Sequence, residues 1–239
     1  ENILVAGFYR LPIVMVAVNR TLGPPWNIWA DQGDTLMFRD AAWIQLYCEN
    51  NQEVVDSIIH GFRLAEDKRV LLPVMVIMDA FIISHTLMET ELPSQELVDS
   101  YLPPMSLPHR MDVNHPVTVG GLTWPLETAS SRVEVDRVMK AVPSVFDEHR
   151  RGFEKHFGRP THGALESLYT EDADLIVVSS GSIATTLSDQ DMADLSAFYE
   201  QHGGKEAASA PPDGAPAASP EVAALLTKGA CASCHGPNY

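Results

Sequence analysis

The first residues with a recognisable chemical use are Asn19 and Arg20, which follow directly after an apolar run at residues 11–18. That run is rich in β-branched residues, as expected of a strand buried on both faces of a parallel sheet. Ligands of open α/β sheets bind beyond the carboxyl ends of the strands. A guanidinium offers paired donors to a carboxylate and stays charged. Position alone therefore makes Arg20, with Asn19 beside it, a candidate for binding an anionic ligand.

Further polar residues follow at Asp31, Gln32 and Asp34. Two interpretations of Arg20 stay open at this point. It binds a substrate carboxylate, or it forms an ordinary ion pair with Asp31 or Asp34. The polar loop itself either orients Arg20 or is a solvated surface loop. For His85 we weigh a proton donor near the site against a histidine that only satisfies local hydrogen bonds.

A second chemical motif lies near the other end of the chain, in Cys231-Ala-Ser-Cys234-His235. This is the attachment pattern of haem c, in which two thiols bind the porphyrin covalently and the histidine ligates iron. We expect Cys231 and Cys234 as attachment residues and His235 as the axial metal ligand if haem is bound.

The elements that must position these residues alternate between strand and helix patterns. Besides residues 11–18, we expect strands at 71–78 and 173–178, with the first two adjacent in one parallel sheet. Helical spacing predicts helices at residues 53–66, 94–101 and 133–157, the last kinked at Pro143. The fold class is therefore α/β, a parallel sheet with flanking helices. Residues 203–220, rich in Ala and Pro, are predicted to be a disordered linker before a short helical tail.

Composition excludes several classes of function. The 239 residues include 16 basic and 32 acidic side chains, a net charge of −16. This argues against nucleic acid, whose phosphates require Lys and Arg, and against an anionic membrane surface. No apolar run is long enough to span a membrane. The start at Glu1 without Met leads us to expect a chain cut within a domain.

Several blocks of sequence, in order, resemble the α subunits of 2-oxoacid:ferredoxin oxidoreductases, the pyruvate enzyme in particular. The resemblance covers residues 1 to about 187. Its blocks are Arg10–Asp34, Tyr47–Val54, Leu72–Val76, Asp79–Thr86, Pro93–Asp99, Gly120–Leu122, His156–Arg159 and Glu171–Ser182.

The resemblance implies a pyrimidine-side domain of a thiamine diphosphate enzyme over residues 1–165. The start of a transketolase C-terminal-like domain would follow at 170–187. Thiamine diphosphate with Mg would be shared with a β subunit, and [4Fe-4S] clusters on partner subunits would pass electrons to ferredoxin. The reaction would convert a 2-oxoacid and coenzyme A to acyl-CoA and carbon dioxide, in the cytoplasm. The 2-oxoacid itself and the oligomeric state are left open.

The resemblance also assigns Arg20 to the substrate carboxylate. It implies no catalytic residue here, because the glutamate that activates thiamine lies upstream of the first block in the family. We therefore expect this chain to be inactive alone. Residues 188–202 resemble a c-type cytochrome helix and 221–239 the start of a cytochrome c domain, which would imply the periplasm. Two explanations stay open, a functional electron-transfer fusion and a chimeric reading frame joined near residue 187.

Overall fold

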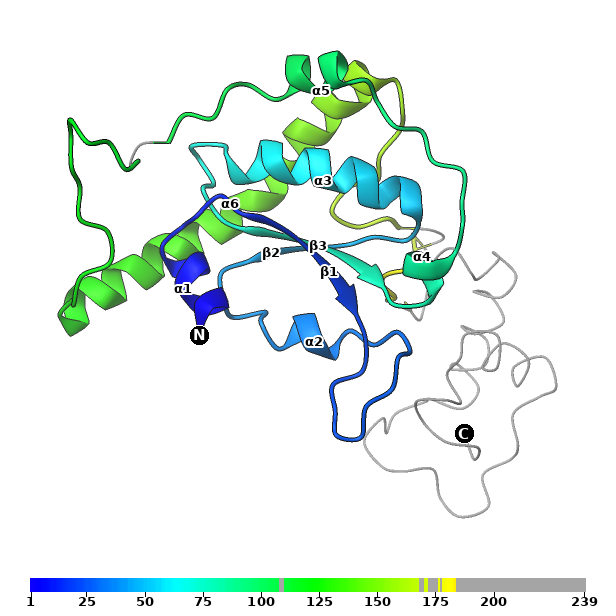
Figure 1. Cartoon of the computed structure of the whole chain (residues 1–239), viewed down its shortest axis with the longest axis horizontal. Helices are drawn as coiled ribbons and strands as arrows, with labels where there is room; N and C mark the ends of the chain where they lie inside the picture. The colour runs from blue at the N-terminus through cyan, green and yellow to red at the C-terminus, as the bar shows by residue number, and fades with distance from the viewer. Residues whose placement is uncertain (108–109, 168–169, 172–175, 177, 184–239) are drawn as a thin grey trace. The chain divides into compact units, whose positions relative to one another are not determined.

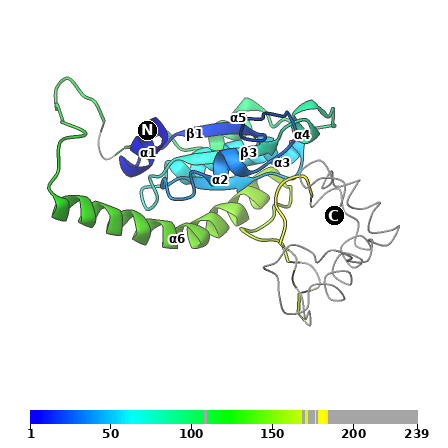
Figure 2. The same ribbon diagram turned by 90° about the horizontal axis from the view of Figure 1, so that it is seen from below.

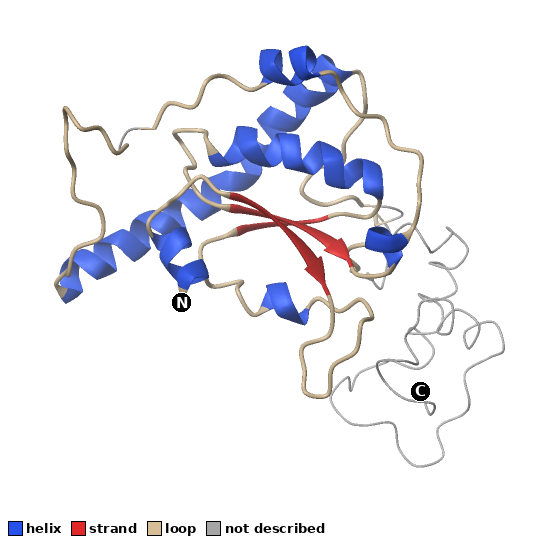
Figure 3. Ribbon diagram, in the orientation of Figure 1, coloured by secondary structure: helices blue, strands red, loops and turns tan. Residues whose placement is uncertain are grey.

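The computed structural model describes residues 1–107, 110–167, 170–171, 176 and 178–183. The chain divides into two units, residues 1–166 and 167–239. The helices and strands given below all lie in the first unit, and Figure 3 separates them by type. None of the described helices is both long and apolar enough to cross a membrane.

A three-stranded parallel sheet forms the centre of this unit. Its strands are β1 (Val14–Asn19), β2 (Ile44–Tyr47) and β3 (Val74–Asp79), in the order β1-β3-β2. In β1 and β3, Val14 pairs with Val74 and Asn19 pairs with Asp79, so both strands end at the same level. Parallel pairing thus brings the residues that follow β1 and β3 to one edge of the sheet.

Helices cover both faces of the sheet, as Figures 1 and 2 show. One face packs against α3 (Asn51–Ala65) and α6 (Pro125–Phe157), in a core that includes Val74 and Val76 of β3. The alternate residues Met75 and Ile77 point to the other face. There they pack with Trp43 and with α1 (Asn2–Phe8), close to α2 (Gly33–Leu36). The apolar β3 sequence is explained by this two-sided burial, because strand side chains alternate between faces.

Local capping fixes where several helices begin. The Asn50 side chain accepts the Glu53 N–H at 2.9 Å at the start of α3. The Ser94 hydroxyl accepts the Leu97 N–H in the same way before α5 (Gln95–Tyr101). Pro125 is the first residue of α6, where its missing N–H costs nothing. A further short helix, α4 (Ile82–His85), follows β3.

The parallel sheet with flanking helices confirms the predicted fold class, and the adjacency of the first two predicted strands is confirmed. Strand β1 begins at Val14, because residues 11–13 form the connection from α1. Helix α6 begins eight residues before the predicted Val133, because its first two turns are exposed and lack the apolar stripe used to predict it. It runs through Pro143 as one helix.

Strand β2 and helix α1 were not predicted. Strand β2 has only four residues, and one of them is the polar Gln45. Residues 203–220 and the helical tail lie outside the described residues, as does most of the predicted strand at 173–178.

Candidate functional site

The carboxyl edge of the sheet carries a network of buried polar side chains. Asn19 is fully buried at the end of β1, and Asp79, which pairs with it at the end of β3, is only 2% exposed. The Asn19 amide group donates to Gln32 Oε1 at 2.7 Å and to Thr35 Oγ1 at 2.6 Å. Because these bonds join β1 to α2 and the residue before it, they fix the ends of the loop between β1 and α2.

Gln32 connects the two strand ends. Its Nε2 donates to Asp79 Oδ1 at 2.8 Å while its Oε1 accepts from Asn19. Thr35 extends the network to β2, because its hydroxyl lies 3.1 Å from the hydroxyl of Tyr47. Gln45 completes it, donating to the Thr35 carbonyl and accepting from the Tyr47 hydroxyl. All three strands are therefore tied to α2 at this edge.

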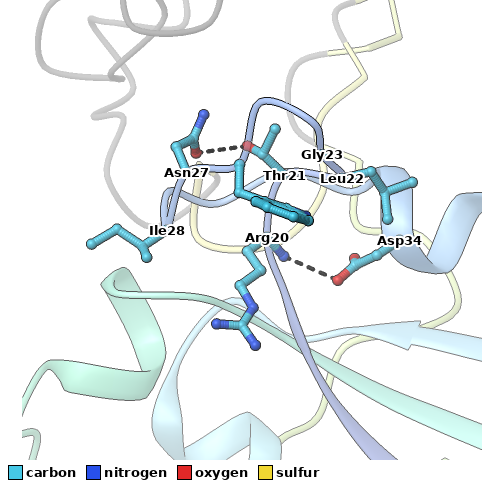
Figure 4. Close-up of a pocket in the computed structure, with 8 residues that line it drawn as sticks. Arg20, Thr21, Leu22, Gly23, Asn27, Ile28 and Asp34 are labelled. Carbon is cyan, nitrogen blue, oxygen red and sulfur yellow. Dashed lines mark hydrogen bonds between the residues drawn. The ribbon is translucent and has the colours of Figure 1, made fainter.

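Arg20 directly follows Asn19, a member of this network, and lines an open cavity of about 470 Å³ (Figure 4). The guanidinium forms no ion pair with any carboxylate in the described part of the chain. The contact with Asp34 is made instead by the backbone, where the Arg20 N–H donates to Asp34 Oδ2 at 3.2 Å. The remaining lining residues are Thr21, Leu22, Gly23, Trp26, Asn27, Ile28 and Asp34.

The electrostatics around Asp34 support a fixed backbone at Arg20. Burial raises the pKa of Asp34, and the Arg20 N–H and positive charge act in the opposite direction. Its second oxygen, Oδ1, is buried and has no hydrogen-bond partner among the described residues. The amide oxygen of Asn19 is likewise buried and unpartnered. Two acceptors next to Arg20 thus have unused hydrogen-bonding capacity, an uncommon condition in a folded protein.

An aromatic contact joins the loop after β1 to the segment after β3. The Trp29 ring lies 5.7 Å from that of Phe81, and Phe81 stacks on His85 at 4.4 Å with an interplanar angle of 8°. Phe81 has φ +65°, a conformation unfavourable for a bulky residue. The Ser84 hydroxyl lies 2.8 Å from His85 Nδ1 and also accepts the Phe81 N–H at 3.0 Å. His85 is therefore held in one orientation while exposed to solvent.

Residues 1–151 match the family described as pyruvate flavodoxin/ferredoxin oxidoreductase, thiamine diphosphate-binding. The chain belongs to this family. It is 45% identical over 190 residues to the pyruvate synthase subunit PorA of Pyrococcus furiosus, covering 79% of this chain and 48% of the relative. PorA of Methanothermobacter thermautotrophicus is 40% identical over 187 residues, 78% of this chain and 49% of that protein.

The ketoisovalerate oxidoreductase subunit VorA of Pyrococcus abyssi is also 40% identical, over 181 residues, with 75% of this chain and 45% of VorA covered. The chain thus spans about half the length of the curated relatives it matches. The chain is therefore similar to subunits named for pyruvate and to one named for ketoisovalerate, at 40–45% identity.

The structure brings together Asn19, Arg20, Gln32 and Asp34, four of the five residues predicted for this site and its loop. Arg20 and Asp34 line the cavity, whereas Asn19 and Gln32 lie in the network beneath it. The fifth, Asp31, accepts the N–H of Gly33 and so shapes the turn into α2. The haem-attachment residues Cys231, Cys234 and His235 lie outside the described residues.

Sequence reasoning missed Asp79, Thr35 and Tyr47. Asp79 ends a strand just as Asn19 does, so its position carried a usable signal. Thr35 and Tyr47 carried none, because only the packing of α2 on the sheet brings them together. Among the described residues, no group of three or more His, Cys, Asp or Glu side chains could hold a metal ion.

Proposed function

We propose that this chain is a segment of the α subunit of a 2-oxoacid:ferredoxin oxidoreductase, with pyruvate as the first oxoacid to test. The enzyme would convert the oxoacid and coenzyme A to acyl-CoA and carbon dioxide and pass the electrons to ferredoxin. The observation that carries the proposal is an arginine without an ion-pair partner among the described residues, lining an open cavity at the carboxyl edge of a sheet of this family.

Arg20 would bind the carboxylate of the oxoacid. Its planar group of donors matches a carboxylate in two-point contact, and the cavity beside it is open to an entering ligand. Asn19 and Gln32 would not contact the substrate. Their hydrogen bonds would hold the backbone that carries Arg20 in place. Asp34 would fix the Arg20 amide, and Asp31 would hold the turn before α2.

Thiamine diphosphate fits this edge as a shared cofactor. When bound, it supplies the carbon nucleophile for the oxo group of the substrate. The described residues offer an arginine and buried amide and hydroxyl groups, which suit a substrate and an organic ring. They offer no carboxylate cluster for a magnesium diphosphate. We infer that a β subunit holds Mg and the diphosphate, that partner subunits hold the [4Fe-4S] clusters, and that this chain alone is inactive.

The test uses a full-length α subunit that contains this segment, assembled with its partner subunits. Arg20→Lys keeps the charge but removes the planar donor pair. Loss of one charge-assisted hydrogen bond, about 1.5–3 kcal/mol, corresponds to about a tenfold to hundredfold rise in KM for the oxoacid. KM for coenzyme A should hardly change. The readout is oxoacid-dependent reduction of ferredoxin.

Arg39→Lys is the matched control, because Arg39 is an exposed arginine whose one ion pair within the described residues is with its neighbour Asp40, at 3.7 Å. Unchanged kinetics for Arg20→Lys would contradict the assignment of Arg20. Absence of oxoacid-dependent ferredoxin reduction in the wild-type complex would contradict the proposed function as a whole.

A second function rests on the motif Cys231-Ala-Ser-Cys234-His235. Haem c attached at the two cysteines, with His235 on iron, would make the tail an electron-transfer module and would place it in the periplasm. A pyridine haemochrome spectrum of the purified chain tests this directly. A haem c absorption band would support the module, and a colourless protein purified after expression with a haem c maturation system would rule it out.

A further inference from the structure

A second cavity, of about 510 Å³, opens at the amino end of the sheet, where Arg10 and Leu71 precede β1 and β3. Arg20 lies at the opposite end of β1, roughly 20 Å away for a six-residue strand. The cavity wall combines Arg10, the turn at residues 68–71 and one side of α6. The lining residues from α6 are Glu134, Arg137, Ala141, Ser144 and Val145.

Positive charge is concentrated around this cavity. Arg10, Lys68, Arg69 and Arg137 line it, four of the 16 basic residues of the chain, and Glu134 is the one acidic residue of the lining. The chain as a whole carries twice as many acidic as basic residues. A lining with four cations and one carboxylate is therefore a local departure from the composition of the chain.

Carboxylates hold two of these arginines in place. Asp67 and Glu148 bind Arg69, at 2.7 and 2.8 Å, but neither lines the cavity. Glu134 binds Arg137 through two bonds of 2.9 and 2.7 Å. Ordering of this kind reduces the side-chain entropy that a ligand would otherwise have to remove on binding.

Three of the four cations, Lys68, Arg10 and Arg137, keep donors for a ligand. Lys68 is exposed and forms no ion pair with any residue in the described ranges. Arg10 donates from Nη2 to the Val70 carbonyl at 2.8 Å, which fixes its plane, and its contact with Glu134 is long, at 3.5 Å. Arg137 uses Nε and Nη2 for Glu134, so its Nη1 group is left for another acceptor.

We propose that this cavity binds a compact oxyanion of the phosphate class. Converging cations with planar donor groups and a flexible ammonium suit a tetrahedral, multiply charged anion better than a single carboxylate. The anion would lie between α6 and the turn at residues 68–71, bound by Arg137, Lys68 and Arg10. The negative charge of Glu134 repels the anion and therefore lowers the affinity of the cavity for it. This inference does not depend on the function proposed for Arg20.

The test is isothermal titration calorimetry of the whole chain with inorganic phosphate, diphosphate and AMP, at constant ionic strength in chloride. Diphosphate should bind more tightly than phosphate because it carries more charge. If AMP binds more tightly than phosphate, the ligand is the phosphate group of a larger ester. Equal or weaker binding of AMP would identify a free oxyanion.

Two substitutions in the cavity lining should change the affinity for diphosphate in opposite directions. Arg137→Ala should weaken diphosphate binding by about tenfold or more, because one charge-assisted bond is lost and Glu134 is left unpaired. Glu134→Gln should tighten binding about two- to fivefold, since the opposing charge is removed. A role for Glu134 and Arg137 in helix stability alone predicts no such gain.

Lys140→Ala is the matched control, because Lys140 lies on the same helix, pairs with Asp136 and is absent from the cavity wall. It should leave diphosphate binding unchanged. No saturable heat with diphosphate, or equal losses in Arg137→Ala and Lys140→Ala, would overturn the proposal. Circular dichroism of each variant confirms that it is folded.

Discussion

At the scale of single residues, Gln32 does most to hold the carboxyl edge together. One amide group accepts from Asn19 and donates to Asp79, so it joins the ends of two strands that pair in register. Asn19 is fully buried, and its amide oxygen already lacks a partner. Removal of the Gln32 side chain would therefore take one hydrogen bond from each of these two buried groups.

Gln32→Ala should lower the free energy of unfolding by about 1–3 kcal/mol, because Asp79 and Asn19 would each lose a buried hydrogen bond. Urea denaturation followed by circular dichroism measures this. Gln95→Ala is the control, since Gln95 makes one exposed bond of 2.8 Å to Asp99 in α5. A loss below about 0.5 kcal/mol for both variants would show that the buried network contributes nothing measurable.

At the scale of elements, the contact between α3 and α6 includes a buried histidine. His60 of α3 is 5% exposed and stacks on Phe146 of α6 at 4.6 Å, with Phe153 at 6.0 Å. Burial, chiefly, lowers the pKa of His60 to about 4. His149, whose ring lies 6.3 Å away, and Arg150 act in the same direction. The contact between α3 and α6 therefore favours the neutral form of the His60 imidazole.

The stability of the chain should therefore fall as the pH falls. The folded-state pKa of His60 lies below its ordinary value of 6.5, so its contribution is present above pH 6.5 and is lost between about pH 6.5 and 4. At pH 5 the loss is about 2 kcal/mol relative to pH 7.5. The basic side chains near His149 include Arg63 and Arg69, and the acidic side chains near it include Asp67 and Glu148.

His60→Phe removes this titration while keeping an aromatic ring between Phe146 and Phe153. We expect its free energy of unfolding to change less between pH 7.5 and 5 than that of the wild type, by about 2 kcal/mol. Equilibrium denaturation at the two pH values measures the difference. The same pH dependence in both proteins would assign the effect to other groups, His149 first among them.

At the scale of the whole molecule, the position of each strand in the sheet decides its exposure. Strand β3 lies between β1 and β2, and Val76 is fully buried. Val16 of β1 is its register partner, yet it is 43% exposed, as is Val18. Within the described residues, β1 pairs only with β3. An edge strand with exposed valines is a template for association with other chains.

Val16→Lys should raise the solubility of the chain and change the free energy of unfolding by less than about 1 kcal/mol, because a charge on an edge strand opposes edge-to-edge pairing. Light scattering during concentration, together with urea denaturation, tests this. Val76→Lys is the matched control in the same register, and it should unfold the protein because it buries an unpaired charge. Equal aggregation of Val16→Lys and wild type would contradict the role of this edge.

The sequence by itself determined the α/β class, two of the three strands in the described part of the chain, and the position of Arg20 just beyond β1. These features are local: apolar runs of strand length, helix-spaced stripes and polar residues where a strand ends. Parallel pairing then follows, because helices connect strands that run in the same direction. Ordered blocks of resemblance added the family, which the match over residues 1–151 confirms.

Only the tertiary structure decided which residues meet. Whether Arg20 pairs with Asp31 or Asp34 depended on the path of the loop, and the structure puts the backbone, not the guanidinium, on Asp34. The contact of Thr35 with Tyr47 and the four cations around the second cavity join residues separated by 12 to more than 100 positions. Such contacts leave no periodic trace in the sequence, because they arise from packing helices on the sheet rather than from the preference of any one segment.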